Sequence, residues 1–234
     1  MENNLLNYLI DKCRTKNIYR PKEKGFIKKI KYFFSRRKKY LFNYKNFSDF
    51  NFGIPKEFIR LDPVELIYLE KISSQSKHAI VEVGRFFGGS TVVFNLSNSN
   101  VPIYSIDLSP QDDDFLNQIL VKINHKHNTN LIIGDSQQKE YPEIKKYDFL
   151  FIDGDHSYDG CLADLKNWWN KLMPNGNLLL HDCYKTDQNG VQDAIKDFIA
   201  EKKNEIEIIN FPFDVTKWKS LRTSFGTICH LKKK

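Results

Sequence analysis

The sequence lacks the features that would place it in an oxidising compartment or across a membrane. No apolar run approaches the roughly 18 residues that cross a bilayer, and the opening residues lack the cationic start of a secretory signal. The few cysteines show no CxxC pair or zinc-ligand spacing, so neither a disulfide framework nor a structural zinc site is indicated. We expect a cytoplasmic protein whose thiols are reduced, and these are Cys13, Cys161, Cys183 and Cys229.

Negative charge is scarce in only one part of the chain. Residues 1–46 hold 14 Lys or Arg against 3 acids, and the remaining residues hold 22 against 26, so the net charge of +7 comes from the leader. Basic pairs there alternate with apolar residues such as Phe26 and Ile30, so a helix would carry an apolar stripe beside a cationic face. We interpret residues 1–56 as a basic amphipathic extension and residues 57–234 as the folded domain.

The extension has three uses that its sequence leaves open. It can lie on an anionic membrane surface, bind nucleic acid through its charge, or dock its apolar stripe on the main domain. Nucleic acid ranks last, because the rest of the chain is acidic and shows none of the usual binding motifs. Docking on the main domain and peripheral contact at the inner face of the membrane remain, and the sequence indicates no oligomeric state.

From residue 57 onward, apolar runs alternate with helical patterns. Strand cores such as AIVEV, FLFI and LLL are continuously apolar, as is typical of strands covered by helices on both faces. The pattern predicts an α/β sandwich with a mostly parallel sheet of seven strands. The expected helices cover residues 57–73, 90–97, 115–123, 161–172 and 191–202, and the expected strands cover residues 78–84, 102–107, 130–134, 147–153, 176–182, 205–211 and 225–231.

Polar and acidic residues follow the ends of the expected strands. In open parallel sheets, ligands bind beyond the carboxyl ends of the strands. Carboxylates gathered at one edge repel one another, so we expect a cation, hydroxyl groups or a positively charged ligand among them. The residues at this edge are Glu82, Gly84, Asp107, Asp135, Ser136, Asp153, Asp155, His156, His181 and Asp182.

Three glycines lie between a strand and a helix in the segment VEVGRFFGGSTVVF, residues 81–94. Glycine lets the backbone pass close to a ligand, and a helix N-terminus can receive an anionic group. The spacing is not GxGxxG, which argues against a nicotinamide or flavin enzyme. The segment resembles the first motif of class I S-adenosylmethionine-dependent methyltransferases, in the ExGxxxGxS form common among O-methyltransferases.

This resemblance implies a Rossmann-like methyltransferase fold with S-adenosylmethionine as cofactor. Asp107 matches the acid that takes the ribose hydroxyls, although a helix cap or loop acid at this position is the alternative. Glu82 would support the glycine turn or the cofactor amine, and Asp135 with Ser136 matches the adenine side. The implied cofactor residues are Glu82, Gly84, Gly88, Ser90, Asp107, Asp135, Ser136 and Asp153.

Two downstream segments, FIDGDHSYDG and LLLHDC, narrow the resemblance. They are similar to the small bacterial branch that includes sugar and macrolide O-methyltransferases and, more distantly, the catechol type, and the likeness covers about residues 60–231. In metal-dependent relatives, acids matching Asp153 and Asp182 hold magnesium. A further oxygen ligand often follows, but Cys183 stands there, and a thiol is a poor partner for a hard cation.

His156 matches the position of the general base in these relatives. Its imidazole can accept the proton that an acceptor hydroxyl loses as the methyl group is transferred in line, with Asp155 as the orienting acid. A loop histidine bonded to backbone is the alternative. His181 stays open between a second base, an acceptor contact and a structural role. The implied catalytic residues are His156, Asp153 and Asp182.

Two aromatic-rich segments carry less information. Trp168 and Trp169 lie on an expected helix, where such a pair is more often core than site. Residues 211–224 mix aromatic and basic side chains, so an acceptor lid, a partner contact and a surface loop all remain open.

The sequence therefore predicts an S-adenosylmethionine-dependent O-methyltransferase acting on a small polyhydroxylated acceptor, such as a sugar of a surface glycan or a secondary metabolite. Magnesium assists the reaction if Asp153 and Asp182 hold it. Two alternatives are a metal-dependent hydroxylase-like enzyme on the same fold and a non-catalytic, membrane-associated binding module.

Overall fold

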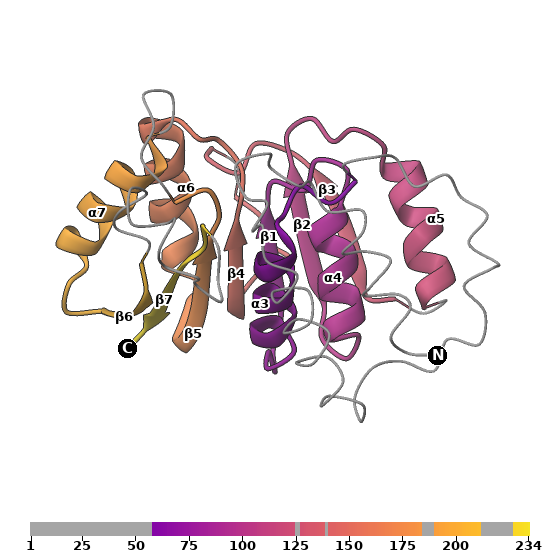
Figure 1. The fold of residues 1–234 in the computed structure, drawn as a ribbon, viewed down its shortest axis with the longest axis horizontal. Helices are drawn as coiled ribbons and strands as arrows, with labels where there is room; N and C mark the ends of the chain where they lie inside the picture. Colours follow the sequence, from indigo (N-terminus) through magenta and orange to yellow (C-terminus); the bar gives the residue numbers. More distant parts are fainter. Residues whose placement is uncertain (1–57, 125–126, 139, 184–189, 212–226) are drawn as a thin grey trace, which may run out of the picture. The chain divides into compact units, whose positions relative to one another are not determined.

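A computed structural model of the chain describes residues 58–124, 127–138, 140–183, 190–211 and 227–234. The chain divides into two compact units, Met1–Pro63 and Val64–Lys234. The second unit contains the sheet (Figure 1). The predicted basic extension, residues 1–56, lies outside the described residues, as do residues 212–224 of the aromatic and basic segment.

Seven strands form one sheet in the order β3-β2-β1-β4-β5-β7-β6 (Figure 1). Neighbours from β3 to β5 pair in parallel, and β7 runs antiparallel to both β5 and β6. This confirms the predicted mostly parallel sheet. The strands are β1 (Ile80–Val83), β2 (Ile103–Asp107), β3 (Thr129–Ile133), β4 (Tyr147–Ile152), β5 (Leu172–Leu180), β6 (Ile206–Asn210) and β7 (Cys229–Lys233).

Helices cover both faces of this sheet. Phe94 of α4 packs edge-on against Phe149 and Phe151 of β4, with ring centroids 5.4 and 5.7 Å apart. The intervening Leu150 and the next residue, Ile152, belong instead to the core shared with α6 and α7, because successive strand residues point to opposite faces. The helices are α3 (Pro63–Ser73), α4 (Gly89–Ser97), α5 (Asp113–Ile123), α6 (Tyr158–Trp169) and α7 (Val191–Glu201).

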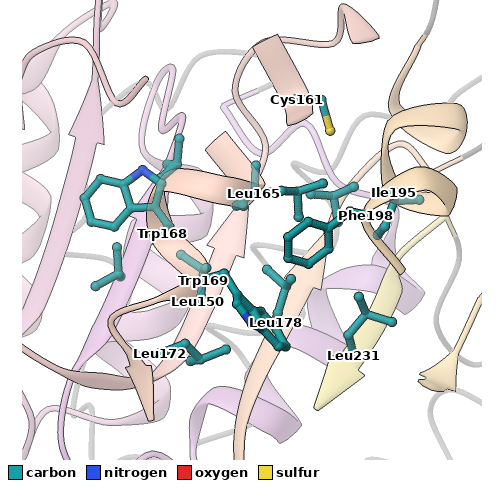
Figure 2. Close-up of a cluster of buried hydrophobic side chains, with 14 of the residues drawn as sticks. Leu150, Cys161, Leu165, Trp168, Trp169, Leu172, Leu178, Ile195, Phe198 and Leu231 are labelled. Carbon is teal, nitrogen blue, oxygen red and sulfur yellow. The ribbon is translucent and has the colours of Figure 1, made fainter. Parts of the chain in front are cut away.

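The core between β4, β5, α6 and α7 is built around two tryptophans (Figure 2). Trp168 and Trp169 are 2 and 1 % exposed, which confirms that the pair is core. Burial of each such ring contributes on the order of 2–3 kcal/mol. Trp168 also donates its indole N–H to the Ser136 carbonyl at 3.1 Å, so the core fixes the loop after β3.

Two elements differ from their expected bounds at proline. The first helix begins at Pro63 rather than at residue 57, because proline suits the first helical position and disfavours helical geometry in the residue before it. The fifth strand begins at Leu172 rather than at residue 176. The Pro-Asn-Gly stretch of residues 174–176 is accommodated by a register shift between β4 and β5, with Asn175 at φ 64°.

Two features of the described residues are the state of the cysteines and the length of the helices. Cys161, Cys183 and Cys229 are buried free thiols, and Cys13 lies outside the described residues. No helix in the described part of the chain is long and apolar enough to cross a membrane.

Candidate active site at the carboxyl edge of the sheet

The glycine turn after β1 presses against the end of β4. Gly84 has φ 83°, and a Cβ added to it would lie 2.2 Å from the carbonyl oxygen of Asp153. The Asp153 N–H also donates to the Val83 carbonyl at 2.8 Å. Only glycine satisfies both the left-handed backbone and this close approach. The predicted cofactor turn and the predicted metal acid therefore lie side by side.

Glu82 is hydrogen-bonded to the residues that follow the glycine turn. Its fully buried carboxylate accepts hydrogen bonds from the Thr91 hydroxyl at 2.5 Å, from the Ser105 hydroxyl at 2.6 Å, and from the Ser90 hydroxyl. Burial raises the pKa of Glu82, and these hydroxyls lower it only in part. The carboxylate therefore joins β1, β2 and the start of α4.

Asp107 fixes the bend between Gly84 and Gly88. One carboxylate oxygen accepts the backbone N–H groups of Arg85 and Phe86, both at 2.8 Å, and the other accepts the Ser109 N–H at 2.7 Å. Phe86 has φ 52°, a conformation that these bonds hold in place. An ionised carboxylate offers about four lone-pair sites, so one remains for a ligand hydroxyl.

Arg85, inside the turn, is a site residue that sequence reasoning missed. Its buried guanidinium donates to both carboxylate oxygens of Asp113 and, at 2.8 Å, to the carbonyls of Ser105 and Ile132. It therefore connects the turn with β2, β3 and the start of α5. The sequence feature that could have indicated this role is a cation among apolar residues in a glycine-rich turn.

The predicted adenine-side residues lie at the end of β3. Asp135 accepts the Gln137 N–H at 2.8 Å, whereas the Ser136 hydroxyl donates to Asp164 of α6 at 2.6 Å. Asp164 is fully buried, and burial raises its pKa to about 6. Its second carboxylate oxygen has no hydrogen-bond partner among the described residues. Ser136 is thus engaged on the α6 side.

His156 lies between the two predicted metal acids, just before the α6 N-terminus. Its Nε2 is 3.4 Å from Asp153 Oδ1 and 3.7 Å from Asp182 Oδ2, and its side chain is 45 % exposed. Asp155, expected to orient this ring, instead accepts the Ser157 N–H at 2.8 Å. The carboxylates that face the ring are those of Asp153 and Asp182.

A buried chain of hydrogen bonds connects Asp153 with His181, Glu65 and Thr227. We call the group of Asp153, His156, His181 and Asp182 at this edge of the sheet the rim. His181 Nδ1 is 3.0 Å from Asp153 Oδ1, and its Nε2 is 3.0 Å from Glu65 Oε2 of α3. The other Glu65 oxygen accepts the Thr227 N–H at 2.7 Å and the Thr227 hydroxyl at 2.6 Å. No local sequence pattern pointed to Glu65, which lies 116 residues from His181.

Opposite charges set the pKa values of the side chains in this series of hydrogen bonds. Burial alone would lower the pKa of His181, but Asp153, Asp182 and Glu65 hold it well above its ordinary value. Burial would raise the pKa of Glu65 and of Asp153, but the His181 charge and hydrogen bonds lower both to about 2. The hydrogen bond to Asp153 raises the pKa of His156, because it outweighs burial.

The donor set at the rim suits a divalent cation. Among the described residues, Asp153, His181 and Asp182 each offer one ligand atom, and these atoms lie within 4.8 Å of one another. Cys183 is not part of this set, because its buried thiol is hydrogen-bonded to Cys229. The third donor atom in this set is a ring nitrogen of His181, two residues before Cys183.

Comparisons with known proteins agree with this geometry. Residues 81–183 match a family model described as a methyltransferase domain. No curated protein matches the sequence. Structural similarity extends over more of the chain than the family match does.

Three solved structures illustrate the similarity. SAH-bound methyltransferase from Podospora anserina has 14 % identity and a TM-score of 0.57, covering 92 % of this chain and 98 % of that one. The apo TDP-rhamnose 3′-O-methyltransferase of calicheamicin biosynthesis has 12 % identity and a TM-score of 0.58, covering 92 % and 95 %. An O-methyltransferase from Bacillus cereus in complex with SAH has 16 % identity and a TM-score of 0.55, covering 74 % and 82 %.

The matched domain gives the class of the segment that carries the glycine turn. Residues 81–183 match a methyltransferase domain, and they lie in a sheet of the order β3-β2-β1-β4-β5-β7-β6. The matched segment runs from the β1 strand through the glycine turn to the Cys183 position, and so includes both predicted metal acids.

Proposed function

We propose that the protein transfers a methyl group from S-adenosylmethionine to a hydroxyl of a small polyhydroxylated acceptor. The observation that carries this proposal is the position of His156, held by Asp153 and Asp182 directly beside the Gly84 turn. A base, two acids and a cofactor turn at one edge are what proton removal during methyl transfer requires.

The cofactor residues follow the order of the strands. Gly84 and the Gly88–Ser90 turn lie nearest the methionine part, the remaining acceptor site of Asp107 takes a ribose hydroxyl, and Asp135 lies at the adenine side. Leu108 and Ile133 add an apolar surface for adenine, being 70 and 63 % exposed at the ends of the paired strands β2 and β3.

His156 acts as the general base. S-adenosylmethionine supplies a methyl group activated on its sulfonium. As the acceptor oxygen bonds to this methyl carbon and the carbon–sulfur bond breaks, the hydroxyl proton passes to Nδ1 of His156, the ring nitrogen that does not face the two carboxylates. Asp153 and Asp182 stabilise the imidazolium that forms, because both carboxylates face its Nε2. Asp153 and Asp182 would hold magnesium if it binds here, and its charge would lower the pKa of the acceptor hydroxyl.

The sugar-like acceptor rests on two supports. The exposed His156 and the acids beside it offer several hydrogen-bond acceptors to adjacent hydroxyl groups. One structurally similar protein is named a TDP-rhamnose 3′-O-methyltransferase. Glycan modification in the cytoplasm, at the inner face of the membrane if residues 1–56 bind lipid, is the setting that we propose.

Purified protein separates this function from the hydroxylase-like alternative. Incubation with methyl-labelled S-adenosylmethionine and a panel of nucleotide sugars should transfer label to a sugar and release S-adenosylhomocysteine. Oxygen consumption without turnover of the methyl donor would support hydroxylation instead.

A further inference from the structure

We propose that His181 is a metal ligand held in place by Glu65, so that the rim binds a divalent transition-metal cation in preference to magnesium. The site consists of Asp153, Asp182 and the Nδ1 atom of His181. It concerns the same edge as the proposed function but is tested by metal binding, so each can fail while the other stands.

The first support is the spacing of the donor atoms. His181 Nδ1 lies 3.0 Å from Asp153 Oδ1 and 3.7 Å from Asp182 Oδ2. Atoms bonded to one cation at about 2.1 Å lie roughly 3.0–3.5 Å apart when their bonds make angles of about 90–110°. The three donors therefore have nearly the separations of neighbouring ligands before any ion enters.

The second support is the partner on the far side of the ring. Metal-ligating histidines usually donate their other ring N–H to a carboxylate, which fixes the tautomer and strengthens the ligand. Here the Nε2 of His181 faces Glu65 at 3.0 Å, and Thr227 anchors that carboxylate with two hydrogen bonds. His181 and Glu65 are 3 and 1 % exposed, so the pair is built into the interior.

The donor chemistry decides which cation fits. Magnesium prefers oxygen ligands and keeps several waters. Imidazole is a better ligand for zinc, iron and nickel than for manganese, and a better ligand for manganese than for magnesium. One nitrogen and two carboxylates therefore favour a divalent transition metal. On binding, the metal takes the Nδ1 lone pair and the Nδ1 proton leaves to solvent.

Manganese is the probe for the test, because its paramagnetism reports a bound nitrogen directly. Chelator-stripped, untagged full-length protein is titrated with Mn²⁺ by electron paramagnetic resonance, with Mg²⁺ as competitor. We expect Mn²⁺ to bind at least ten times more tightly than Mg²⁺ and to show nitrogen coupling in the spin-echo spectrum.

Three variants assign the nitrogen. His181→Asn keeps an oxygen donor, so it should abolish the nitrogen coupling, weaken Mn²⁺ binding at least tenfold and leave Mg²⁺ binding nearly unchanged. Glu65→Gln should weaken Mn²⁺ binding roughly 10- to 100-fold while the coupling remains. His230→Asn is the matched control, because His230 is equally buried but bonds Tyr68 and Asn177, and it should change neither value.

If His181→Asn fails to fold, the Mn²⁺ and Mg²⁺ affinities and the nitrogen coupling of the wild type still decide the question. Equal affinity for the two cations, no binding of either, or no nitrogen coupling would overturn the proposal. Coupling that survives in a folded His181→Asn variant and disappears in His156→Ala would also overturn it, because the nitrogen would then belong to His156. Affinity for S-adenosylhomocysteine, measured on the same samples, reports separately on the proposed function.

Discussion

At the scale of single residues, two carboxylates from different strands hold His156. Asp153 follows β4 and Asp182 follows β5, and their side chains meet at Nε2 of one exposed ring. The backbone carbonyl of His156 accepts the Gly190 N–H at 2.9 Å, which ties the loop to the start of α7. Two carboxylates therefore position the ring, and the contact with Gly190 positions the backbone that carries it.

Replacing His156 by alanine should lower methyl-transfer turnover by roughly two to four orders of magnitude, as expected for loss of a general base. Affinity for S-adenosylhomocysteine should stay nearly unchanged, because the glycine turn does not contact this ring through any described hydrogen bond. Steady-state kinetics and calorimetry check the two halves, with exposed His78→Ala as control. Unchanged turnover would remove His156 from the mechanism.

Asp107 should matter for affinity rather than for turnover at saturating cofactor. Asp107→Ala removes the ribose acceptor and also the partner of the Arg85 and Phe86 N–H groups, so we expect cofactor affinity to fall about tenfold or more. Asp107→Asn keeps one oxygen and should lose less. Calorimetry that shows equal affinity in the wild type and in Asp107→Ala would contradict the ribose role.

At the scale of elements, the site depends on how closely β1 and β4 approach each other at their carboxyl ends. Gly84 lets the turn pass over the Asp153 carbonyl, and Glu82 and Arg85 fasten that turn to α4, β2, β3 and α5. The reacting groups are thus carried on a rigid edge instead of on a free loop.

Gly84→Ala should destabilise the fold by about 3 kcal/mol or more, because the new methyl group meets backbone and the φ of 83° is strained for alanine. Gly154→Ala is the control, since the atom nearest to its added Cβ would be a side-chain oxygen at 3.3 Å. Denaturant unfolding measures both. Equal stability of the two variants would show that the β1–β4 approach is looser than described.

Asp164 should give stability a pH dependence of known sign. Its folded pKa of about 6 lies above the ordinary value, so its contribution is fully present below about pH 4 and is lost as the pH rises through 6. Relative to the wild type, Asp164→Asn should gain on the order of 2–3 kcal/mol between pH 4 and pH 8. A stability difference that does not change with pH would contradict the raised pKa; Asp159→Asn, an exposed change on the same helix, is the control.

The sequence predicted the strands and the acids at their ends because both depend on local pattern. Continuous apolar runs marked the buried strands, and the positions that follow them hold Asp107, Asp153 and Asp182. It could not predict that Glu65 and Thr227 complete the His181 site, because those contacts span 116 and 162 residues. Nor could it show that Ser136 is engaged by Asp164, since serine in such a loop can face either side.

At the scale of the whole molecule, charge is divided between the predicted basic extension and an acidic remainder. The residues that form the site come from α3, from the ends of β1 to β5 and from Thr227, all within the unit Val64–Lys234. The site residues named above therefore include none from residues 1–46, and the use of those residues is a separate question.

Deleting residues 1–46 should leave affinity for S-adenosylhomocysteine unchanged. If the extension contacts membranes, the deletion should also abolish sedimentation with anionic liposomes at low salt, because it removes a net charge of +11. Neutral liposomes are the control. Liposome binding that survives the deletion would exclude the extension as the membrane anchor.

Calorimetric titration of the purified full-length chain with S-adenosylhomocysteine tests whether the Gly84 turn binds the cofactor. The account predicts saturable binding of one nucleoside per chain that is weakened by Asp107→Ala and unaffected by His156→Ala. A folded protein that shows no binding of this nucleoside would contradict the assignment of the Gly84 turn, and with it the proposed methyl transfer.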